Sequence, residues 1–489
     1  MKITELKPAA LWARFAEICQ IPHPSHHEVA IRKYVVDFAE GLGLDYTVDG
    51  ADNVIVRKPA TAGMEGRKGI VLQAHLDMVP QANGDRLNAA GEKFDFTKDP
   101  IEPYIDGERV KARGTTLGAD NGIGVAAMLS ILASKELKHG PLEMLFTATE
   151  ETGMVGAFGL EAGLLQGDIL VNLDSERGHE LCTGCAGGTD ANISLPYVAA
   201  AAPQGLKAVE IVVKGLKGGH SGIEIIMQRA NANKLIARTL RPHLVAGAQL
   251  ASIDGGGLRN AIPREARAVL LVPADRYAAL VEEVARMEAL SREEFKDIEE
   301  GISITAAPAA YPTEIIPAVT ALNLVDLVLI VPDGVVKMST SMPGLVQTSS
   351  NFARVASDGG AVKMHALVRS SLRSEKELVC ERIAALCGLV GAECELTGSY
   401  DGWNPNMSSP ILKTMAAGYE TLFGERPEVT AVHAGLECGI IGGVYPRLDM
   451  ISCGPTIRFP HSPDEEVYIA SVERFWRFLV HALEHVPSK

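Results

Sequence analysis

The chain has 489 residues, of which 47% are hydrophobic and 22% are charged. This length exceeds one ordinary core and predicts at least two domains, and the composition excludes a disordered chain. The net charge of −15 argues against nucleic acid or an anionic membrane as a partner.

The ends of the chain and its cysteines point to the cytoplasm. MKITELKPAALWARF has no apolar core followed by a small-residue cleavage site, so no signal peptide is predicted. The most apolar stretch, ALNLVDLVLIVP, contains Asp326 and is shorter than the roughly 20 residues of a membrane span. Cys182 and Cys185 form a C-x-x-C without a second copy, so we expect reduced thiols and neither a zinc ribbon nor disulfides.

Helical and strand patterns alternate through the first part of the chain. Residues 7–19 have apolar side chains at helical spacing, and HPSHHEVAIRKYVVDFAEGLG predicts a second helix in which Ser25 and Glu28 have capping-box spacing. Strands are predicted for four apolar runs, NVIVRKP, GIVLQAHLD, PLEMLFTATEE and DILVNLDSE. A helix is predicted among them for NGIGVAAMLSILAS. This alternation indicates an α/β sheet.

The pattern changes after GCAGG. A strand, a helix and a strand are predicted in turn for KAVEIVVKGLKGGHSGIEI, RANANKLIARTL and EARAVLLVPAD. A second cycle follows in VQTSSNFARVAS, AVKMHALVRSSLR and KELVCERIAALCGLVG. An asparagine followed by a strand, at Asn260 and again at Asn351, suggests two similar halves. From about Ser399 the α/β pattern returns and continues to a C-terminal helix.

Candidate residues of a metal site occur where apolar runs end or beside glycine and proline, the positions at which a parallel-sheet enzyme presents side chains to a cleft. They are His75, Asp77, Asp120, Glu150, Glu151, Asp174 and His461. Each residue alone has a common structural explanation. Several carboxylates at the ends of buried strands would be costly without partners, so together they predict a two-metal hydrolase.

The chemistry of these side chains suggests how two ions would be shared. A carboxylate can bridge two divalent ions, and Asp120, beside glycines at a strand-to-helix turn, suits that role. His75 and Asp174 would complete one ion, and Glu151 and His461 the other. This mixed nitrogen and oxygen set, without a thiolate, favours zinc, with cobalt or manganese as alternatives.

The two remaining carboxylates would act around the ions. Asp77 lies two residues after His75 and would accept the second N–H of its imidazole. Glu150 would take a proton from the water that bridges the metals and pass it to the leaving amine. Because His461 lies far along the chain from the other ligands, we expect a discontinuous catalytic domain, residues 1–186 and 400–489, interrupted by residues 187–399.

The motifs resemble the metallopeptidase family that includes aminoacylase, carboxypeptidase G and succinyl-diaminopimelate desuccinylase, and the resemblance covers nearly the whole chain. It is carried by VLQAHLDMVPQ, GTTLGADNGIG, TATEETGMVGAFGL, GCAGG, GLKGGHSG, RNAIPREA, HAGLECG and GPTIRFPHSPDE. The resemblance is closer still to one branch of this family, the carnosinase-like dipeptidases that cleave Xaa-His dipeptides. The resemblance implies a dizinc exopeptidase-type catalytic domain, with a mostly parallel mixed sheet between helices, and an inserted α+β lid domain that is doubled. It also implies the same ligands, general base and role of Asp77.

The resemblance further implies substrate-binding residues in the lid domain. His220, in GGHSG, would polarise the scissile carbonyl or stabilise the oxyanion. Asn260 and Arg369 would hold the substrate carboxylate, which suits the bidentate geometry of arginine. HAGLECG would either offer backbone N–H groups to a carboxylate or pack against the strand that carries His75.

The expected function is metal-dependent hydrolysis of dipeptides, preferentially Xaa-His, by a cytoplasmic enzyme. The alternatives within the family are another dipeptidase or an N-acyl-amino-acid amidohydrolase. A non-catalytic binding protein is disfavoured because no ligand or base is missing, and a calcium site is disfavoured by the two histidines. The expected partner is a small dipeptide, without nucleic acid or membrane. A homodimer is compatible with this, although a doubled lid does not require one.

Overall fold

The computed structural model describes residues 2–489, and the chain divides into two compact units. The first unit runs up to Gly184 and also contains Pro405–Ala431 and Leu436–Lys489. The second unit contains Cys185–Asn404 and Val432–Gly435. The first unit thus combines distant parts of the chain, and the long connection between them forms the second.

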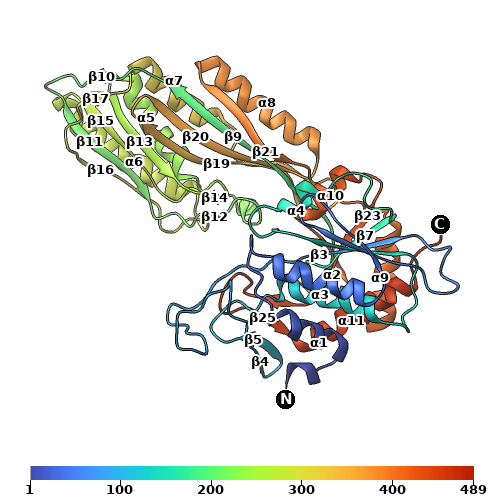
Figure 1. Ribbon diagram of the computed structural model, residues 1–489. Coiled ribbons are helices and arrows are strands. Elements are labelled where there is room, and N and C mark those ends of the chain that lie inside the picture. Colours follow the sequence, from blue (N-terminus) through green and yellow to red (C-terminus); the bar gives the residue numbers. More distant parts are fainter. Residues whose placement is uncertain (1) are drawn as a thin grey trace. The chain divides into compact units, whose positions relative to one another are not determined.

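The first unit is built on an eight-stranded mixed sheet (Figure 1). In spatial order its strands are β1 (Asp45–Val48), β2 (Val54–Lys58), β6 (Leu142–Thr147), β3 (Ile70–His75), β7 (Ile169–Asn172), β23 (Asp449–Ser452), β8 (Glu180–Cys185) and β22 (Glu428–Val432). The central strands β6, β3, β7 and β23 are parallel. The pairs β1–β2, β2–β6 and β23–β8 are antiparallel, so the parallel character predicted from the sequence belongs to the centre of the sheet.

The central strands β3 and β6 are buried along their whole length, because helices cover both faces of this sheet. The helices of the unit are α1 (Ala9–Ile18), α2 (Val29–Gly41), α3 (Ala119–Ala133), α4 (Val155–Gly159), α9 (Pro410–Phe423), α10 (Glu437–Val444) and α11 (Ile469–Glu484), with a 3₁₀ turn at Ile3–Glu5. One large apolar core joins alternate strand residues to α1, α2, α3, α9 and α11. Figure 1 shows α4 and α10 on the side of β3 and β7 that is opposite to α2 and α3. This confirms the expected sheet between two layers of helices.

A small four-stranded sheet lies beside the helices of the first unit. Its order is β24 (Ile457–Arg458), β25 (Glu466–Tyr468), β5 (Arg109–Ala112) and β4 (Pro103–Asp106). The strands β24 and β25 form an antiparallel hairpin, and His461 lies in its loop. Because β25 pairs with β5, this loop is held near the segment that leads into α3.

The second unit contains the same motif twice. Its strands are β9 (Gly187–Pro196), β11 (Lys207–Lys214), β13 (Gln249–Gly256), β15 (Ala266–Val272), β16 (Ser303–Pro308), β18 (Gly334–Met338), β19 (Val346–Asp358), β20 (Ala361–Ser370) and β21 (Glu393–Tyr400), and its helices are α5 (Ala232–Val245), α6 (Tyr277–Glu294), α7 (Ala318–Ile330) and α8 (Arg373–Val390). One repeat reads β11-α5-β13-β15-α6-β16, and the other reads β9-α7-β19-β20-α8-β21.

Both repeats have the same spatial strand order, and they share one nine-stranded sheet. In each, the fourth strand of the repeat lies outermost, followed by the first, the third and the second. The two second strands, β13 and β19, pair and join the repeats. The first repeat is inserted in the second between β9 and α7. Short pairs, β10 (Ala200–Ala201) with β17 (Glu314–Ile315) and β12 (Gly219–His220) with β14 (Ala261–Ile262), complete the unit.

Two local predictions are wrong. Ser25 and Glu28 do not form a capping box, because α2 begins at Val29 and neither side chain caps it. Their oxygens bind elsewhere, Ser25 at Asp77 and Glu28 at Thr149. The two similar halves are present, but the two asparagines do not mark equivalent points of them, because Asn351 lies inside β19 whereas Asn260 precedes β14.

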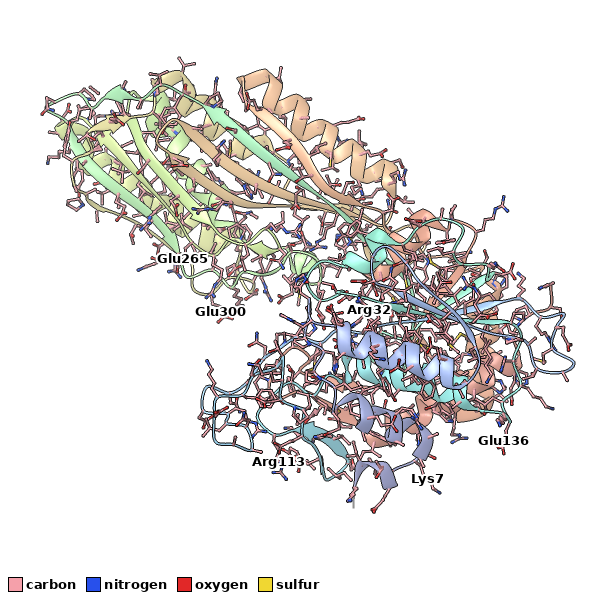
Figure 2. All side chains as sticks on the ribbon, in the orientation of Figure 1. Lys7, Arg32, Arg113, Glu136, Glu265 and Glu300 are labelled. Carbon is pink, nitrogen blue, oxygen red and sulfur yellow. The ribbon has the colours of Figure 1, made fainter. Side chains whose placement is uncertain are left out.

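Charged side chains lie on the surface, and the cysteines form no disulfides within residues 2–489. Figure 2 shows charged side chains projecting from both units, among them Lys7, Arg113 and Glu136 on the first. Within residues 2–489 no disulfide links the eight cysteines, as expected. Over the same range, no helix combines the length and the apolar character that a membrane span requires.

Candidate active site

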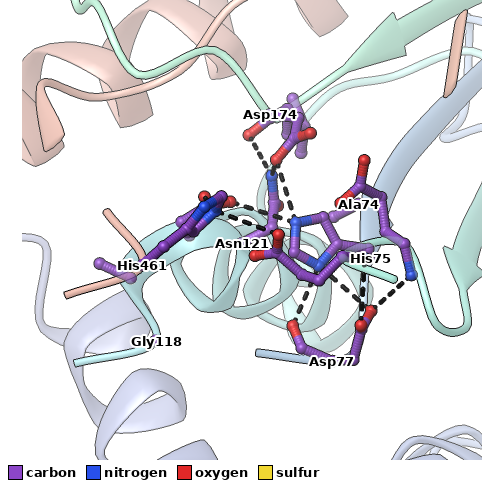
Figure 3. A network of polar contacts seen from close by, with 12 residues as sticks. Ala74, His75, Asp77, Gly118, Asn121, Asp174 and His461 are labelled. Atoms are coloured by element: carbon purple, nitrogen blue, oxygen red, sulfur yellow. Dashed lines mark hydrogen bonds and ion pairs between the residues drawn. The ribbon is translucent and has the colours of Figure 1, made fainter. Parts of the chain in front are cut away.

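His75 lies at the end of the central strand β3 with only 1% of its surface exposed. Its Nε2 atom is 3.1 Å from Oδ1 of Asp120 and 3.3 Å from Oδ1 of Asp174. Its Nδ1 atom is 3.0 Å from the backbone oxygen of Asp77 and 3.5 Å from the Asp77 carboxylate. Nδ1 is therefore engaged by Asp77, mainly through the backbone, and Nε2 is directed at the acidic side chains (Figure 3).

The Asp77 carboxylate organises the loop that follows β6. Its Oδ1 accepts a hydrogen bond from the backbone N–H of Glu150 at 2.8 Å, and its Oδ2 accepts one from that of Glu151 at 3.2 Å. The Ser25 hydroxyl donates to Oδ2 at 2.7 Å. Burial opposes ionisation, but His75 and these donors outweigh it and lower the pKa of Asp77 to about 2.

Asp120 lies between the two histidines. Its Oδ1 faces His75, and its Oδ2 is 3.3 Å from Nε2 of His461. The same His461 nitrogen is 3.0 Å from Oε2 of Glu151. Asp174 follows β7 and accepts a hydrogen bond from the Asn121 side chain (Figure 3). The structure thus brings all five predicted ligands into one cluster, with Asp120 central as a bridging carboxylate requires.

This cluster fits divalent ions. His75, Asp120 and Glu151 each offer a ligand atom, and these atoms lie within 4.8 Å of one another. Within residues 2–489, the buried Oε1 of Glu151 has no hydrogen-bond partner. Hydrogen bonds to Asp120 and Glu151 raise the pKa of His461 to about 11. The cluster therefore attracts positive charge at the positions where metal ions would replace these protons.

Glu150 lies in the same acidic surroundings. Burial raises the pKa of this carboxyl group well above its usual value. His75 opposes the shift, whereas Asp174, Glu437 and Glu151 add to it. A carboxylate with raised proton affinity suits a general base near neutral pH. The general-base role of Glu150 stays a prediction.

In the second unit, His220 has a defined tautomer. Its Nδ1 atom accepts hydrogen bonds from the backbone N–H groups of Gly222 and Ile223, each at 3.1 Å. Burial and the charge of Arg369 lower the pKa of His220, so the imidazole is neutral. The proton must then be on Nε2, which makes this atom the hydrogen-bond donor that an oxyanion requires.

Arg369 lies near His220 in the second unit. It is 6% exposed, and within residues 2–489 its Nε atom has no hydrogen-bond partner and its guanidinium forms no ion pair. Its charge also lowers the pKa of the buried His433, after burial itself. A buried guanidinium among neutral histidines is costly alone and favours an anionic ligand.

Asn260 is exposed and lies next to His220, because His220 pairs with Ala261 in the β12–β14 ladder. The side chain of Asn351 donates to the backbone oxygens of Arg259 and Ala261, at 3.0 and 2.9 Å. Asn351 therefore holds the segment that carries Asn260. The substrate roles of His220, Asn260 and Arg369 remain predictions.

Two buried glutamates were missed by the sequence reasoning, although both lie in motifs that it singled out. Glu437, in HAGLECG, accepts hydrogen bonds from Gln73 at 2.6 Å and Thr147 at 2.8 Å. This part of the motif therefore packs against the strand that carries His75, as one of its two interpretations proposed. Glu465, in HSPDE, binds the backbone around Asp120.

An α/β unit in which imidazoles and carboxylates meet near strand ends is typical of a metal-dependent hydrolase. The comparison with known families agrees. The model of peptidase family M20/M25/M40, a family of metal-dependent peptidases, matches residues 71–485. The chain belongs to this family.

Two relatives match over their full length. The chain is 45% identical to the cytosol non-specific dipeptidase of Escherichia coli K12, with 100% of both chains covered. It is also 45% identical to the aminoacylhistidine dipeptidase of Vibrio alginolyticus, whose crystal structure superimposes with a TM-score of 0.94 over 100% of this chain and 99% of that one. Aminopeptidase PepT of Bacillus cereus, 16% identical with a TM-score of 0.57 over 98% and 99% of the chains, shares the fold.

Proposed function

We propose that this protein is a two-metal dipeptidase that cleaves Xaa-His dipeptides preferentially. The observation that carries the proposal is the cluster of Asp120 between His75 and His461, with Glu150 and Glu151 on the adjoining loop. The 45% identity to two dipeptidases over the whole chain supports the same reaction. The cytosolic name of the Escherichia coli relative supports a cytoplasmic location.

His75, Asp120 and Asp174 would hold one ion, and Asp120, Glu151 and His461 the other. Zinc suits this set, with cobalt or manganese as alternatives. When bound, two such ions would lower the pKa of a water molecule and polarise the peptide carbonyl. The chain's own side chains would supply the remaining steps.

Glu150 would take the proton of the attacking water and deliver it to the leaving amine. Its raised proton affinity supports both transfers. His220 would donate from Nε2 to the oxygen that gains negative charge, which its backbone-fixed tautomer supports. Arg369 would bind the substrate carboxylate, and Asn260 would assist it. A required free carboxylate would restrict cleavage to the C-terminal end of a short peptide.

The preference for histidine is the finer part of the proposal. The two relatives of equal identity have different names, one non-specific and one aminoacylhistidine. A panel of β-Ala-His, Gly-His, Ala-Ala, a tripeptide and an N-acetyl amino acid separates the outcomes. Each substrate is assayed with the metal-loaded protein, after chelation, and after restoring zinc, manganese or cobalt.

We expect chelation to abolish activity, metal to restore it, and Xaa-His dipeptides to be the preferred substrates. Equal cleavage of Ala-Ala would retain the dipeptidase and reject the histidine preference. Activity only on the N-acetyl amino acid would replace the dipeptidase by an amidohydrolase. Full activity after complete removal of metal would reject the two-metal mechanism.

A further inference from the structure

A buried carboxylate outside the ligand set binds the backbone beside Asp120. Oε2 of Glu465 accepts hydrogen bonds from the N–H groups of Leu117 at 2.7 Å and Gly118 at 2.9 Å. Oε1 accepts them from Ala119 at 2.8 Å and Asp120 at 3.2 Å. Glu465 is 2% exposed. Four consecutive N–H groups, which precede the regular part of α3, thus surround one carboxylate.

We call these four N–H groups, from Leu117 to Asp120, the cradle. The backbone can form it because Gly118 has a left-handed conformation, with φ of 70°. A Cβ atom at Gly118 would lie 3.1 Å from the sulfur of Met78, so both the conformation and the space favour glycine. Asp120, the last donor of the cradle, then directs its side chain between the two histidines.

Glu465 also belongs to the loop that carries His461. This loop joins β24 to β25, and the backbone N–H of Glu465 bonds to the oxygen of Ser462 at 3.0 Å. The His461 side chain is 50% exposed, so burial alone does not fix it. His75 and Asp174, by contrast, are attached to adjacent parallel strands of the central sheet. One carboxylate therefore connects the backbone of one ligand to the loop of another.

We propose that Glu465 is a positioning residue of the metal centre. It sets the distance between Asp120 and His461, so that the ion held by Asp120, Glu151 and His461 depends on it more than the other ion does. This inference rests on the proposed two-metal function. It assigns Glu465 no contact with substrate or metal.

The test compares Glu465→Gln with a matched neighbour. The glutamine has the shape of the glutamate, but its NH₂ group would face backbone N–H groups instead of accepting from them. The control is Glu466→Gln, because Glu466 is also buried and is bound to Arg109 at 3.0 Å and Lys111 at 3.7 Å, away from the cradle. Glu465→Asp retains the charge on a shorter side chain.

Each full-length protein is stripped of metal and titrated with Zn²⁺ and Co²⁺ by calorimetry, and the kcat, the KM and the melting temperature are measured. We expect Glu465→Gln to weaken one of two binding events by about tenfold or more, which is the usual effect of losing such a support. The other event should stay near the parent value. The kcat should fall with little change in KM, and Glu465→Asp should recover part of the loss. Glu466→Gln should bind both ions as the parent does.

The inference is overturned if Glu465→Gln binds both ions with parental affinity, or if it weakens both equally. It is also overturned if Glu466→Gln has the same effect on metal binding, because the loss would then be general to buried carboxylates of this hairpin. If Glu465→Gln does not fold, Glu465→Asp decides, and parental metal binding by that variant rejects the role. A parent that binds no second ion would reject the proposed two-metal function itself, and this inference with it.

Discussion

The carboxylate of Asp77 is bonded directly to the backbone of Glu150, at 2.8 Å. A residue expected only to support His75 therefore also fixes the loop that carries the proposed base and the ligand Glu151. Replacing Asp77 by asparagine should consequently affect both metal binding and catalysis. We expect losses of about 10- to 100-fold in metal affinity and in kcat, measured by metal titration and steady-state kinetics. Ser25→Ala, which removes one donor to Asp77, should give a smaller loss of the same kind.

Glu150→Gln should separate catalysis from metal binding. The amide cannot accept the proton of the attacking water, so kcat should fall by about 10²- to 10⁴-fold while two ions remain bound. Elemental analysis of the purified variant gives the metal content. Asp120→Ala is the contrasting variant, because it should lose metal as well as activity. Substantial turnover by Glu150→Gln would show that another group is the base.

His220→Ala should reduce kcat and leave the metal content unchanged. If the Nε2 proton stabilises the oxyanion, its loss should lower kcat by about 10²- to 10³-fold with a small change in KM. Ser221→Ala, a change at the next residue, serves as a control for disturbance of the GGHSG turn. A variant that retained kcat and raised only KM would indicate a role in substrate binding instead.

Arg369→Ala should abolish the preference for a free carboxylate. The parent should cleave a dipeptide faster than its C-terminal amide, because the amide cannot pair with the buried guanidinium. The variant should lose about 10- to 100-fold in kcat/KM on the dipeptide and little on the amide. Equal losses on both substrates would argue against carboxylate recognition by Arg369.

His433 should make the protein less stable in acid. Burial, with smaller contributions from the charges of Arg369 and His220, lowers the pKa of His433 from 6.5 to about 3. The unfolded chain therefore takes up a proton near pH 6.5, whereas the folded chain does so only near pH 3. The stability contribution of the neutral ring is complete above pH 6.5 and is lost as the pH falls from there towards 3.

Between pH 7 and pH 5 this loss should be about 2 kcal/mol. Urea unfolding of the metal-free parent and of His433→Asn at both pH values measures it. The stability difference between the parent and the variant should shrink by that amount at pH 5. An unchanged difference would mean that His433 is protonated in the folded protein at pH 5.

Part of the site could be predicted because two of its proposed ligands lie at or just after the ends of buried strands. His75 and Asp174 come after apolar runs whose burial the sequence reveals, and parallel strands bring such ends together. The repeat in the second unit was visible only as two similar cycles. Its interruption, with β9 separated from α7 by a whole repeat, requires strand pairing that no local pattern reports.

The supports of the site could not be predicted, because they depend on contacts between distant segments. Ser25 and Glu28 have the spacing of a helix cap, yet the structure uses their oxygens for Asp77 and Thr149. From the sequence alone, Glu465 is one acidic residue in a charged turn. Its backbone partners, among them Leu117 and Ala119, are distant in the sequence and are found only in the structure. Local rules fail here because a buried partner outweighs a weak local preference.

The position of His461 has a consequence for synthesis of the protein. A growing chain acquires His75, Asp120, Glu151 and Asp174 early, but it gains its last ligand only after the whole second unit has been made. Because domains fold as they emerge, N-terminal parts first, the second unit can fold before the metal centre is complete. If His461 is a ligand as proposed, peptide hydrolysis would be withheld from unfinished chains. A product truncated before the final hairpin would be inactive and would also lack α11, which packs into the core of the first unit.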